Sequence, residues 1–162
     1  MRKINIIYLG DIKDKEEYYK KAVEEYEKRL GSAFKIINTE IKQERLPDKP
    51  SDNEILAGLN REAVRIKEKS IKSAYKIALC IEGKKLSSED FSNLIYNEKA
   101  QNSPCIEFYI GSSHGLSSEI KQSCNLMLSF SDMTFPHRLM RVILLEQIYR
   151  AYTIHSNIKY HK

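Results

Sequence analysis

Five short apolar runs recur along this chain, and segments with the apolar periodicity of helices separate them. The runs cover residues 4–9, 34–41, 75–81, 105–110 and 125–130, and the helical segments cover 14–30, 51–71, 88–96 and a short stretch after Ser117. Buried strands that alternate with helices form parallel sheets, because each crossover helix must cover one face of the sheet. The sequence therefore predicts an α/β fold, with a mostly parallel sheet and helices on both faces.

Two local signals locate the second helix. Ser51 and Glu54 have the spacing of a capping box, which predicts that the helix begins there. Pro47 and Pro50 precede the box and predict an irregular connection after the second strand.

Length and composition indicate one globular domain covering residues 1–162, since 41% of the residues are hydrophobic and 30% are charged. No run reaches membrane-spanning length, and the run at 4–9 is too short for a signal peptide. Cys80, Cys105 and Cys124 are odd in number and lack CxxC spacing, so we expect buried reduced thiols in a cytoplasmic protein. No set of His, Cys and acidic residues has metal-ligand spacing, so no metal is expected.

Basic residues gather at the C-terminal end. The formal net charge is +5, and residues 137–162 contribute +4 of it, with five basic residues against one acid. Such a segment suits a polyanionic partner such as RNA. A solvated basic tail explains the same charge equally well, so charge alone leaves both interpretations open.

Three consecutive strand ends carry small and polar residues. The third strand ends in Glu82-Gly83, the fourth in IGSSHGL (110–116) and the fifth in FSDMTFPH (130–137). Ligands of parallel sheets bind beyond the carboxyl ends of the strands, and these loops suit a flat, partly apolar ligand such as an adenosine. Simple turns are the alternative, and we interpret Gly83 as a turn residue.

The last helical stretch is unusually apolar on all sides. Pro136 predicts that the helix begins at the proline. Apolar residues between 139 and 154 cover much more than the stripe of roughly 100° that a one-sided surface helix needs. Either the domain encloses this helix, or its second side packs on another subunit. A terminal helix of a small domain is hard to enclose, so we expect a symmetric homodimer.

Several of these segments together resemble one family. INIIYLG, EYEKRLG, LSFSDMTFPHRLMRVILLEQIYRAYTI and the terminal YHK are similar to the bacterial large-subunit rRNA pseudouridine N3-methyltransferases, of the SPOUT (trefoil-knotted) class. The resemblance spans the whole chain and implies a single SPOUT domain with a C-terminal trefoil knot. It implies that S-adenosyl-L-methionine is used, without metal, to methylate N3 of pseudouridine 1915 in helix 69 of 23S rRNA. The implied partners are the assembled ribosome and a second copy of the chain.

The resemblance also implies roles for individual residues. The family ends in Tyr-His followed by Arg or Lys, which matches Tyr160, His161 and Lys162. The chemistry needs a base, for which His161 is the candidate, a cation for the developing anion, for which Arg150 and Lys162 are candidates, and a contact to the target base, for which Tyr160 is the candidate. Which residue takes which role stays open, and a frayed tail is the alternative. The candidate RNA contacts, taken from the basic C-terminal segment, are His137, Arg138, Arg141, Lys159 and Lys162. The implied cofactor contacts are Leu79, Gly111, Phe130, Ser131, Asp132, Met133, Thr134 and Phe135.

Two positions depart from the family pattern. Ser112 stands where a second glycine is usual, and serine is costly there if the backbone needs a positive φ. Cys80 stands where an acidic residue is common, which leaves a polar role at that position open.

Three other functions would share some of these sequence features. A non-catalytic RNA-binding α/β protein would share the basic end but would not need three ligand-type loops. A SPOUT methyltransferase that acts on tRNA would share the knot and cofactor site but usually brings an extra RNA-binding domain. An ordinary nucleotide-dependent α/β methyltransferase is disfavoured, because the first strand ends in YLGDIKD, with one glycine in place of a Gly-x-Gly loop.

Overall fold

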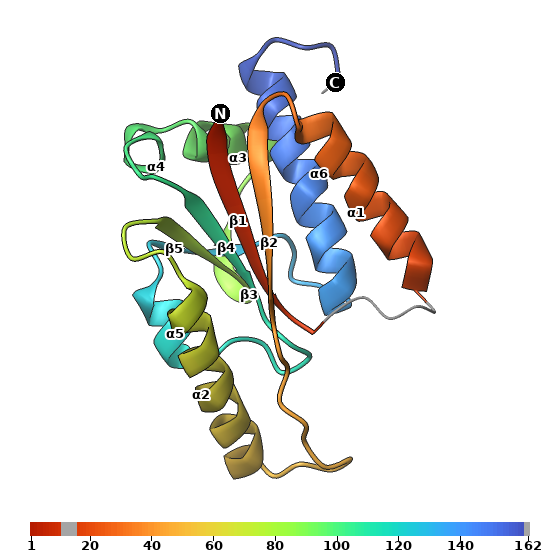
Figure 1. The fold of residues 1–162 in the computed structure, drawn as a ribbon, viewed down its shortest axis with the longest axis vertical. Helices are drawn as coiled ribbons and strands as arrows, with labels where there is room; N and C mark the ends of the chain where they lie inside the picture. Colours follow the sequence, from red (N-terminus) through yellow and green to blue (C-terminus); the bar gives the residue numbers. More distant parts are fainter. Residues whose placement is uncertain (11–15, 161–162) are drawn as a thin grey trace.

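A parallel five-stranded sheet forms the centre of the molecule, in the order β2-β1-β4-β3-β5 (Figure 1). It is seen in a computed structural model that describes residues 1–10 and 16–160. Every strand pair is parallel, which confirms the predicted α/β fold. The strands are β1 (Arg2–Leu9), β2 (Phe34–Ile41), β3 (Tyr75–Lys85), β4 (Ile106–Ile110) and β5 (Leu126–Ser129).

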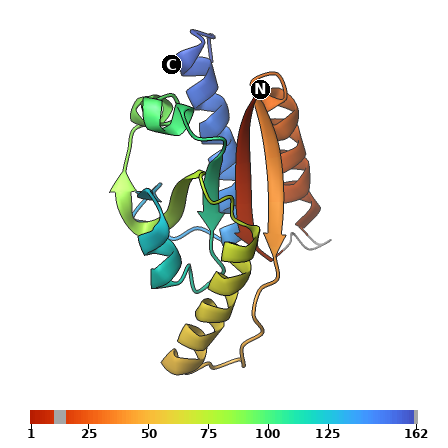
Figure 2. The same cartoon turned by 60° about the vertical axis from the view of Figure 1, so that its left-hand side comes forward.

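Helices cover both faces of this sheet, as predicted. Side chains of α1, α3 and α6 pack with Ile4 and Ile6 of β1 in one core cluster, on the face seen with α6 in Figure 1. Side chains of α2 and α5 pack with Ile7 and Leu9 in a second cluster on the opposite face (Figure 2). The helices are α1 (Glu17–Leu30), α2 (Asp52–Lys69), α3 (Ser88–Ile95), α4 (Glu98–Gln101), α5 (Ser118–Ser123) and α6 (His137–His155).

The capping box at the start of α2 is confirmed. The Ser51 hydroxyl accepts a hydrogen bond from the Glu54 N–H at 3.2 Å, and the Ser51 N–H donates to Glu54 Oε2 at 2.8 Å. These two bonds satisfy donors that would otherwise be open at the helix end. The preceding segment, 42–50, has no helix or strand, as its two prolines predict.

The interpretation of Gly83 as a turn residue is wrong. Gly83 lies inside β3, which continues to Lys85 and pairs again with β5 after a register shift. A Cβ added at Gly83 would stand 2.6 Å from the backbone carbon of Leu128. The glycine is therefore required because two backbones touch there, and no signal near Gly83 in the sequence reveals that contact.

Gly83→Ala is expected to lower the free energy of unfolding by about 1–3 kcal/mol, because the new methyl group overpacks against backbone that cannot swing away. Urea denaturation followed by circular dichroism measures the change. Gly31→Ala is the matched control, since a Cβ there meets nothing closer than 3.4 Å and its φ of −58° suits alanine. Equal midpoints for the two variants would contradict the close contact.

Helix α6 lies between α1 and α3 on the sheet. The helix begins at His137 with Pro136 as its N-cap, one residue after the predicted start. Leu144, Leu145 and Ile148 are fully buried. Three half-buried apolar side chains of α6, in contrast, lie outside the core cluster: Leu139, Ile143 and Ile154. The prediction that one face could not bury the whole apolar set is therefore confirmed.

Candidate functional site

A pocket of about 730 Å³ opens at the carboxyl ends of β3, β4 and β5. We call it the strand-end pocket. Its volume falls within the range of about 300–1,000 Å³ that is usual for small-ligand sites. Its lining comes from residues 79–82, 110–116, 128–131 and 133–137, with Lys121 and Met140. The three strand ends selected from the sequence thus meet in one cavity.

Every residue expected to contact a cofactor lines this pocket except Asp132. The Asp132 carboxylate instead pairs with the Lys85 ammonium at 2.6 Å, and 78% of its side chain is exposed. Leu79, Phe130 and Phe135 supply apolar surface, while the other lining positions supply backbone and hydroxyl groups. This mixture suits a ligand with one flat apolar part and a polar edge.

The loop after β4 is held tightly closed. Ser112 and Gly115 form a short antiparallel bridge, in which the Gly115 N–H donates to the Ser112 carbonyl at 2.9 Å. A Cβ added at Gly111 would stand 2.4 Å from the Gly115 backbone. Gly115 carries the positive φ of this loop, at +81°. Among the described residues only Asn157 combines a side chain with positive φ, so the expected strain at Ser112 does not arise.

The loop after β5 is shaped by its own serines. Ser129 Oγ donates to the Ser131 carbonyl at 3.0 Å, and the Met133 N–H donates to Ser131 Oγ at 2.9 Å. With this loop shape, Met133 lines the pocket and is 74% exposed. Large exposed apolar side chains often mark surfaces that a ligand or partner covers.

Charged and titratable groups on the pocket wall are few. Lys121 pairs with Glu82, and this contact holds the pKa of the Glu82 carboxyl below its ordinary value. Burial raises the pKa of the Cys80 thiol. Cys105 is buried as expected, whereas Cys80 and Cys124 are only half-buried, which corrects the prediction that all three lie in the interior.

His137 was expected to contact RNA, but it lines the strand-end pocket. Burial lowers the pKa of its ring below the ordinary value for histidine. Its Nε2 atom is buried and meets no hydrogen-bond partner in the described part of the chain.

The other residues expected to contact RNA lie in different settings. Arg138 pairs with Glu16 at 2.8 Å, which ties α6 to the start of α1. Arg141 is 9% exposed and stacks over the Tyr8 ring at 4.2 Å, so it packs mainly inside the domain. Lys159 is exposed, and Lys162 lies outside the described residues.

Two of the residues expected to be catalytic, Arg150 of α6 and Tyr160 beyond its end, meet away from the strand-end pocket. Arg150 donates to Glu146 Oε1 at 2.6 Å, and the Tyr160 hydroxyl donates to Glu146 Oε2 at 3.0 Å. The Arg150 guanidinium also lies 5.0 Å from the centre of the Tyr160 ring. We call Glu146, Arg150 and Tyr160 the tail cluster; His161 lies outside the described residues.

The tail cluster and the strand-end pocket are separated along α6. Glu146 follows His137 by nine residues, which is about 14 Å of helix at about 1.5 Å per residue. The sequence reasoning missed Glu146, although its i,i+4 spacing to Arg150 is a usable signal. Burial and the Glu146 hydrogen bond raise the pKa of the Tyr160 hydroxyl, which stays neutral at physiological pH.

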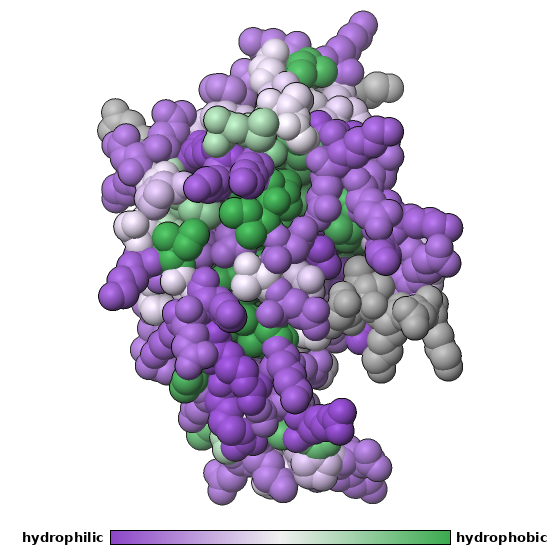
Figure 3. All heavy atoms as spheres, viewed as in Figure 1, coloured by the Kyte–Doolittle hydropathy of each residue, from purple (hydrophilic) through white to green (hydrophobic). Residues whose placement is uncertain are grey.

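Neither a membrane span nor a metal-binding group is found among the described residues. Within residues 1–10 and 16–160, no helix combines the length and apolar character needed to cross a bilayer. On the face in Figure 3, hydrophobic patches are scattered among hydrophilic side chains. Over the same described ranges, no three His, Cys, Asp or Glu side chains form a group able to hold a metal ion.

Comparison with known proteins agrees with this architecture. The family described as "Predicted SPOUT methyltransferase" matches residues 2–161. A protein named "Ribosomal RNA large subunit methyltransferase H" from Streptococcus suis is 44% identical over 160 residues, covering 99% of each chain. Proteins of the same name from Streptococcus gordonii and Streptococcus equi subsp. zooepidemicus are 41% and 42% identical, with the same coverage. This chain therefore belongs to the SPOUT methyltransferase family.

Proposed function

We propose that this protein is an S-adenosylmethionine-dependent methyltransferase that modifies N3 of pseudouridine 1915 in helix 69 of 23S rRNA, on assembled ribosomes. The observation that carries the proposal is the strand-end pocket, in which the expected cofactor residues of three separate strand ends meet. The relatives are named as methyltransferases of large-subunit ribosomal RNA, and their sequence similarity to this chain extends over 99% of it. A ribosomal substrate supports a location in the bacterial cytoplasm.

The strand-end pocket fits the cofactor by size and by chemistry. Leu79, Phe130 and Phe135 offer apolar faces for the adenine ring, and the closed loop at Gly111 brings backbone groups to its edge. The bound cofactor supplies a methyl group on a positively charged sulfonium. Holding the acceptor nitrogen in line with that methyl group is the main task of the protein.

The acceptor nitrogen sets a second task. The imide nitrogen of pseudouridine carries a proton at neutral pH, and this proton must leave as the new N–C bond forms. We assign its removal to His161, and stabilisation of the resulting negative charge to Arg150 or Lys162. Tyr160 stacks on or hydrogen-bonds the base. Lys159 and Arg138 remain the proposed RNA contacts in the segment that carries most of the positive charge, whereas Arg141 is buried against Tyr8 and His137 lines the strand-end pocket.

A C-terminal trefoil knot is part of the proposal. Its support is the double pairing of Leu128, which pairs in β5 with Leu79 and again with Lys84 of β3. Residues 80–83 therefore pass around Leu128, and Gly83 touches its backbone. Such a close crossing of two segments is the kind of contact that threading one through a loop of the other requires.

A homodimer is also part of the proposal. Leu139, Ile143 and Ile154 of α6 lie outside the core cluster, and Met133 is exposed nearby in sequence. A second copy of the chain would bury these apolar side chains in a symmetric contact. Sedimentation equilibrium of the purified protein tests the assignment, and a monomer at micromolar concentration would contradict it.

S-adenosylmethionine is expected to protect Cys80 from alkylation. Cys80 lines the strand-end pocket and is half-buried, and burial raises the pKa of its thiol, so its reaction with iodoacetamide at pH 7.5 starts slow. A ligand in the pocket slows it further by blocking access. Peptide mass spectrometry with and without the cofactor measures the protection, and Cys124, outside the pocket lining, is the internal control.

The reaction itself is tested by transfer of a labelled methyl group. Ribosomes, free large subunits and naked 23S rRNA are incubated with the purified protein, with and without a chelator. The proposal predicts transfer to assembled ribosomes that the chelator leaves unchanged. Transfer that favours naked rRNA, or that chelation abolishes, would contradict the proposed substrate or the metal-free site.

A further inference from the structure

The chain turns back on itself after α6. Asn157, two residues beyond the helix, has a positive φ of 52°. Its N–H donates to the Ile154 carbonyl at 3.2 Å, and the Ile158 N–H donates to the Thr153 carbonyl at 2.8 Å. Two such bonds around a residue in the left-handed region form a Schellman motif, a common helix end in which glycine or asparagine takes the left-handed position. The motif gives the start of the tail a defined direction.

Tyr160 contacts α6 again after this turn. Its hydroxyl donates to Glu146 Oε2 at 3.0 Å. Its ring meets the Tyr149 ring edge-on, with 4.9 Å between the ring centres. Edge-to-face aromatic pairs are favourable when the centres are roughly 4.5–7 Å apart. A hydrogen bond and an aromatic pair therefore hold Tyr160 at one place on the helix.

Helix α1 packs beside the same part of α6. The Tyr26 ring of α1 lies 6.4 Å from the Tyr149 ring. The Arg29 guanidinium lies 5.5 Å from the centre of the Tyr26 ring and 5.8 Å from that of Tyr149. Cations attract aromatic faces within about 6 Å of the ring centre. Arg29 also pairs with Glu25 at 2.8 Å, one turn earlier in α1, and this pair helps to keep the guanidinium in place.

The Tyr26 hydroxyl links α1 directly to the tail cluster. Burial raises the pKa of this hydroxyl, and hydrogen bonds to Glu146 and Tyr160 raise it as well. The hydroxyl is therefore protonated at physiological pH, and beside a carboxylate it acts as a donor. Glu146 thus receives hydrogen bonds from α1 and from the tail at the same time.

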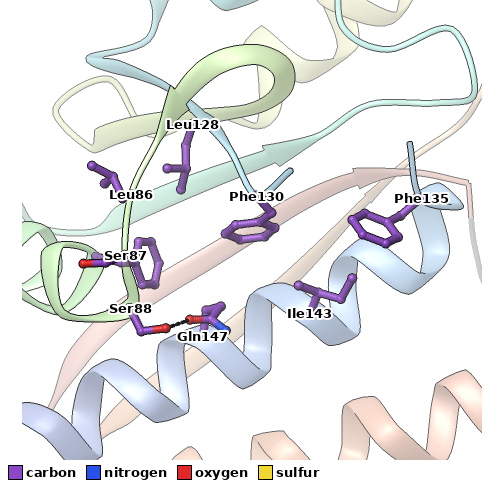
Figure 4. A pocket seen from close by; sticks show the side chains of 9 residues that line it. Leu86, Ser87, Ser88, Leu128, Phe130, Phe135, Ile143 and Gln147 are labelled. Carbon is purple, nitrogen blue, oxygen red and sulfur yellow. Dashed lines mark hydrogen bonds between the residues drawn. The ribbon is translucent and has the colours of Figure 1, made fainter. Parts of the chain in front are cut away.

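A different side of α6 faces α3. Gln147 accepts a hydrogen bond from the Ser88 hydroxyl of α3 at 2.8 Å, and together with Ile143 it lines a pocket of about 260 Å³ (Figure 4). No residue of the tail cluster lines this pocket or the strand-end pocket. The contacts that place the tail cluster are therefore those with α1.

We propose that Tyr26 is a positioning residue for the catalytic tail, and that it holds Tyr160 in the working position through the Glu146 carboxylate that both hydroxyls share. This inference rests on the proposed function, which assigns catalysis to the tail, and extends it to α1. A tail that is ordered before the ribosome binds does not have to lose its conformational freedom during the reaction. Tyr26 lies outside the strand-end pocket, so its effect is on the tail and not on the cofactor.

Tyr26→Phe tests this role, because phenylalanine keeps the ring and removes the hydroxyl. We expect kcat for methyl transfer to ribosomes to fall about 5-fold to 20-fold, since a hydrogen bond to a charged group is lost. The KM values for S-adenosylmethionine and for ribosomes, and the melting temperature, should stay close to the wild-type values. Tyr18→Phe is the matched control on the same helix, since Tyr18 is 61% exposed, and it should leave every value unchanged.

A protease measures the position of the tail without any RNA. Trypsin cuts after Lys159, which is exposed, and the cut releases residues 160–162. Cleavage requires the segment to leave its packed position, so its rate follows the open fraction of the tail. We expect Tyr26→Phe to release this peptide about 5-fold to 20-fold faster than the wild type, and Tyr18→Phe to release it at the wild-type rate. Mass spectrometry of the intact protein follows the cut.

A double-mutant cycle tests the route through the carboxylate. When Glu146 is already replaced in Glu146→Leu, the further change Tyr26→Phe should have little effect on kcat, because the shared acceptor is absent. An equal loss in both backgrounds would show that Tyr26 does not act through Glu146 and would overturn the inference.

The outcomes separate this inference from the proposed function. If the wild-type protein methylates ribosomes and Tyr26→Phe does so equally well, the positioning role is wrong and the function stands. If Tyr26→Phe is faster than the wild type, the observed tail contact is a resting state, and the inference fails while the function stands. If the wild-type protein transfers no methyl group to any RNA, the proposed function and this inference both fail.

Discussion

Deletion of Tyr160, His161 and Lys162 is expected to abolish methyl transfer to ribosomes while S-adenosylmethionine binding stays close to the wild-type value. Tyr160 contacts Glu146 and Arg150, and neither of these residues lines the strand-end pocket. The deletion therefore removes the proposed catalytic groups and leaves the cofactor site intact. Single-turnover methyl transfer and calorimetric cofactor titration measure the two effects separately. A truncated protein that methylates at the wild-type rate would show that the tail has no catalytic role.

His161→Ala then distinguishes a general base from an RNA contact. Loss of a general base costs about 10²-fold to 10⁴-fold in rate. Part of that loss is recovered at higher pH, where solvent removes the imide proton. Loss of an RNA contact appears instead as weaker ribosome binding with little recovery. The pH dependence of kcat and of the apparent ribosome affinity reports which role applies.

Gly111→Val is expected to weaken S-adenosylmethionine binding about 10-fold to 100-fold. A Cβ at this position would stand 2.4 Å from the Gly115 backbone, so the loop must open to admit any side chain. Overpacking of this kind costs about 1–3 kcal/mol, and about 1.4 kcal/mol corresponds to tenfold in affinity. Calorimetric titration measures the effect.

Gly115→Ala is the matched control for this loop. A Cβ at Gly115 meets nothing within 4 Å, although its φ of +81° is unfavourable for alanine. This variant should lose about 1 kcal/mol of stability and keep most of its cofactor affinity. Equal affinities for Gly111→Val and the wild type would place the cofactor elsewhere.

The sheet could be predicted because buried strands require apolar residues, and these are visible in the sequence. Parallel strands covered on both faces read as continuous apolar runs, and all five runs became strands. The strand-end pocket followed from the same fact, since the carboxyl ends of parallel strands meet at one edge. The resemblance then supplied which loop residues are expected to contact a cofactor, and all of them except Asp132 line the strand-end pocket.

Contacts between segments that are distant in the sequence could not be predicted from local patterns. Gly83 is required by the backbone of Leu128, and the polar residues around Gly83 resemble an ordinary turn. Serine at position 112 is costly only if that position needs a positive φ, and the positive φ of that loop belongs to Gly115. The pairing of Ser88 with Gln147 joins residues 59 positions apart. Local patterns predict elements and loops, whereas these details depend on which elements become neighbours.

The central claim is that this protein transfers a methyl group to one defined nitrogen of the ribosome. The most direct measurement is mass mapping of 23S rRNA after ribosomes lacking the modification are incubated with S-adenosylmethionine and the wild-type protein, with the variant that lacks Tyr160, His161 and Lys162 as the inactive comparison. We predict a gain of one methyl group at pseudouridine 1915, located on N3 by fragmentation, with wild-type protein alone. A methyl group at another nucleotide, or none in any RNA, would contradict the claim.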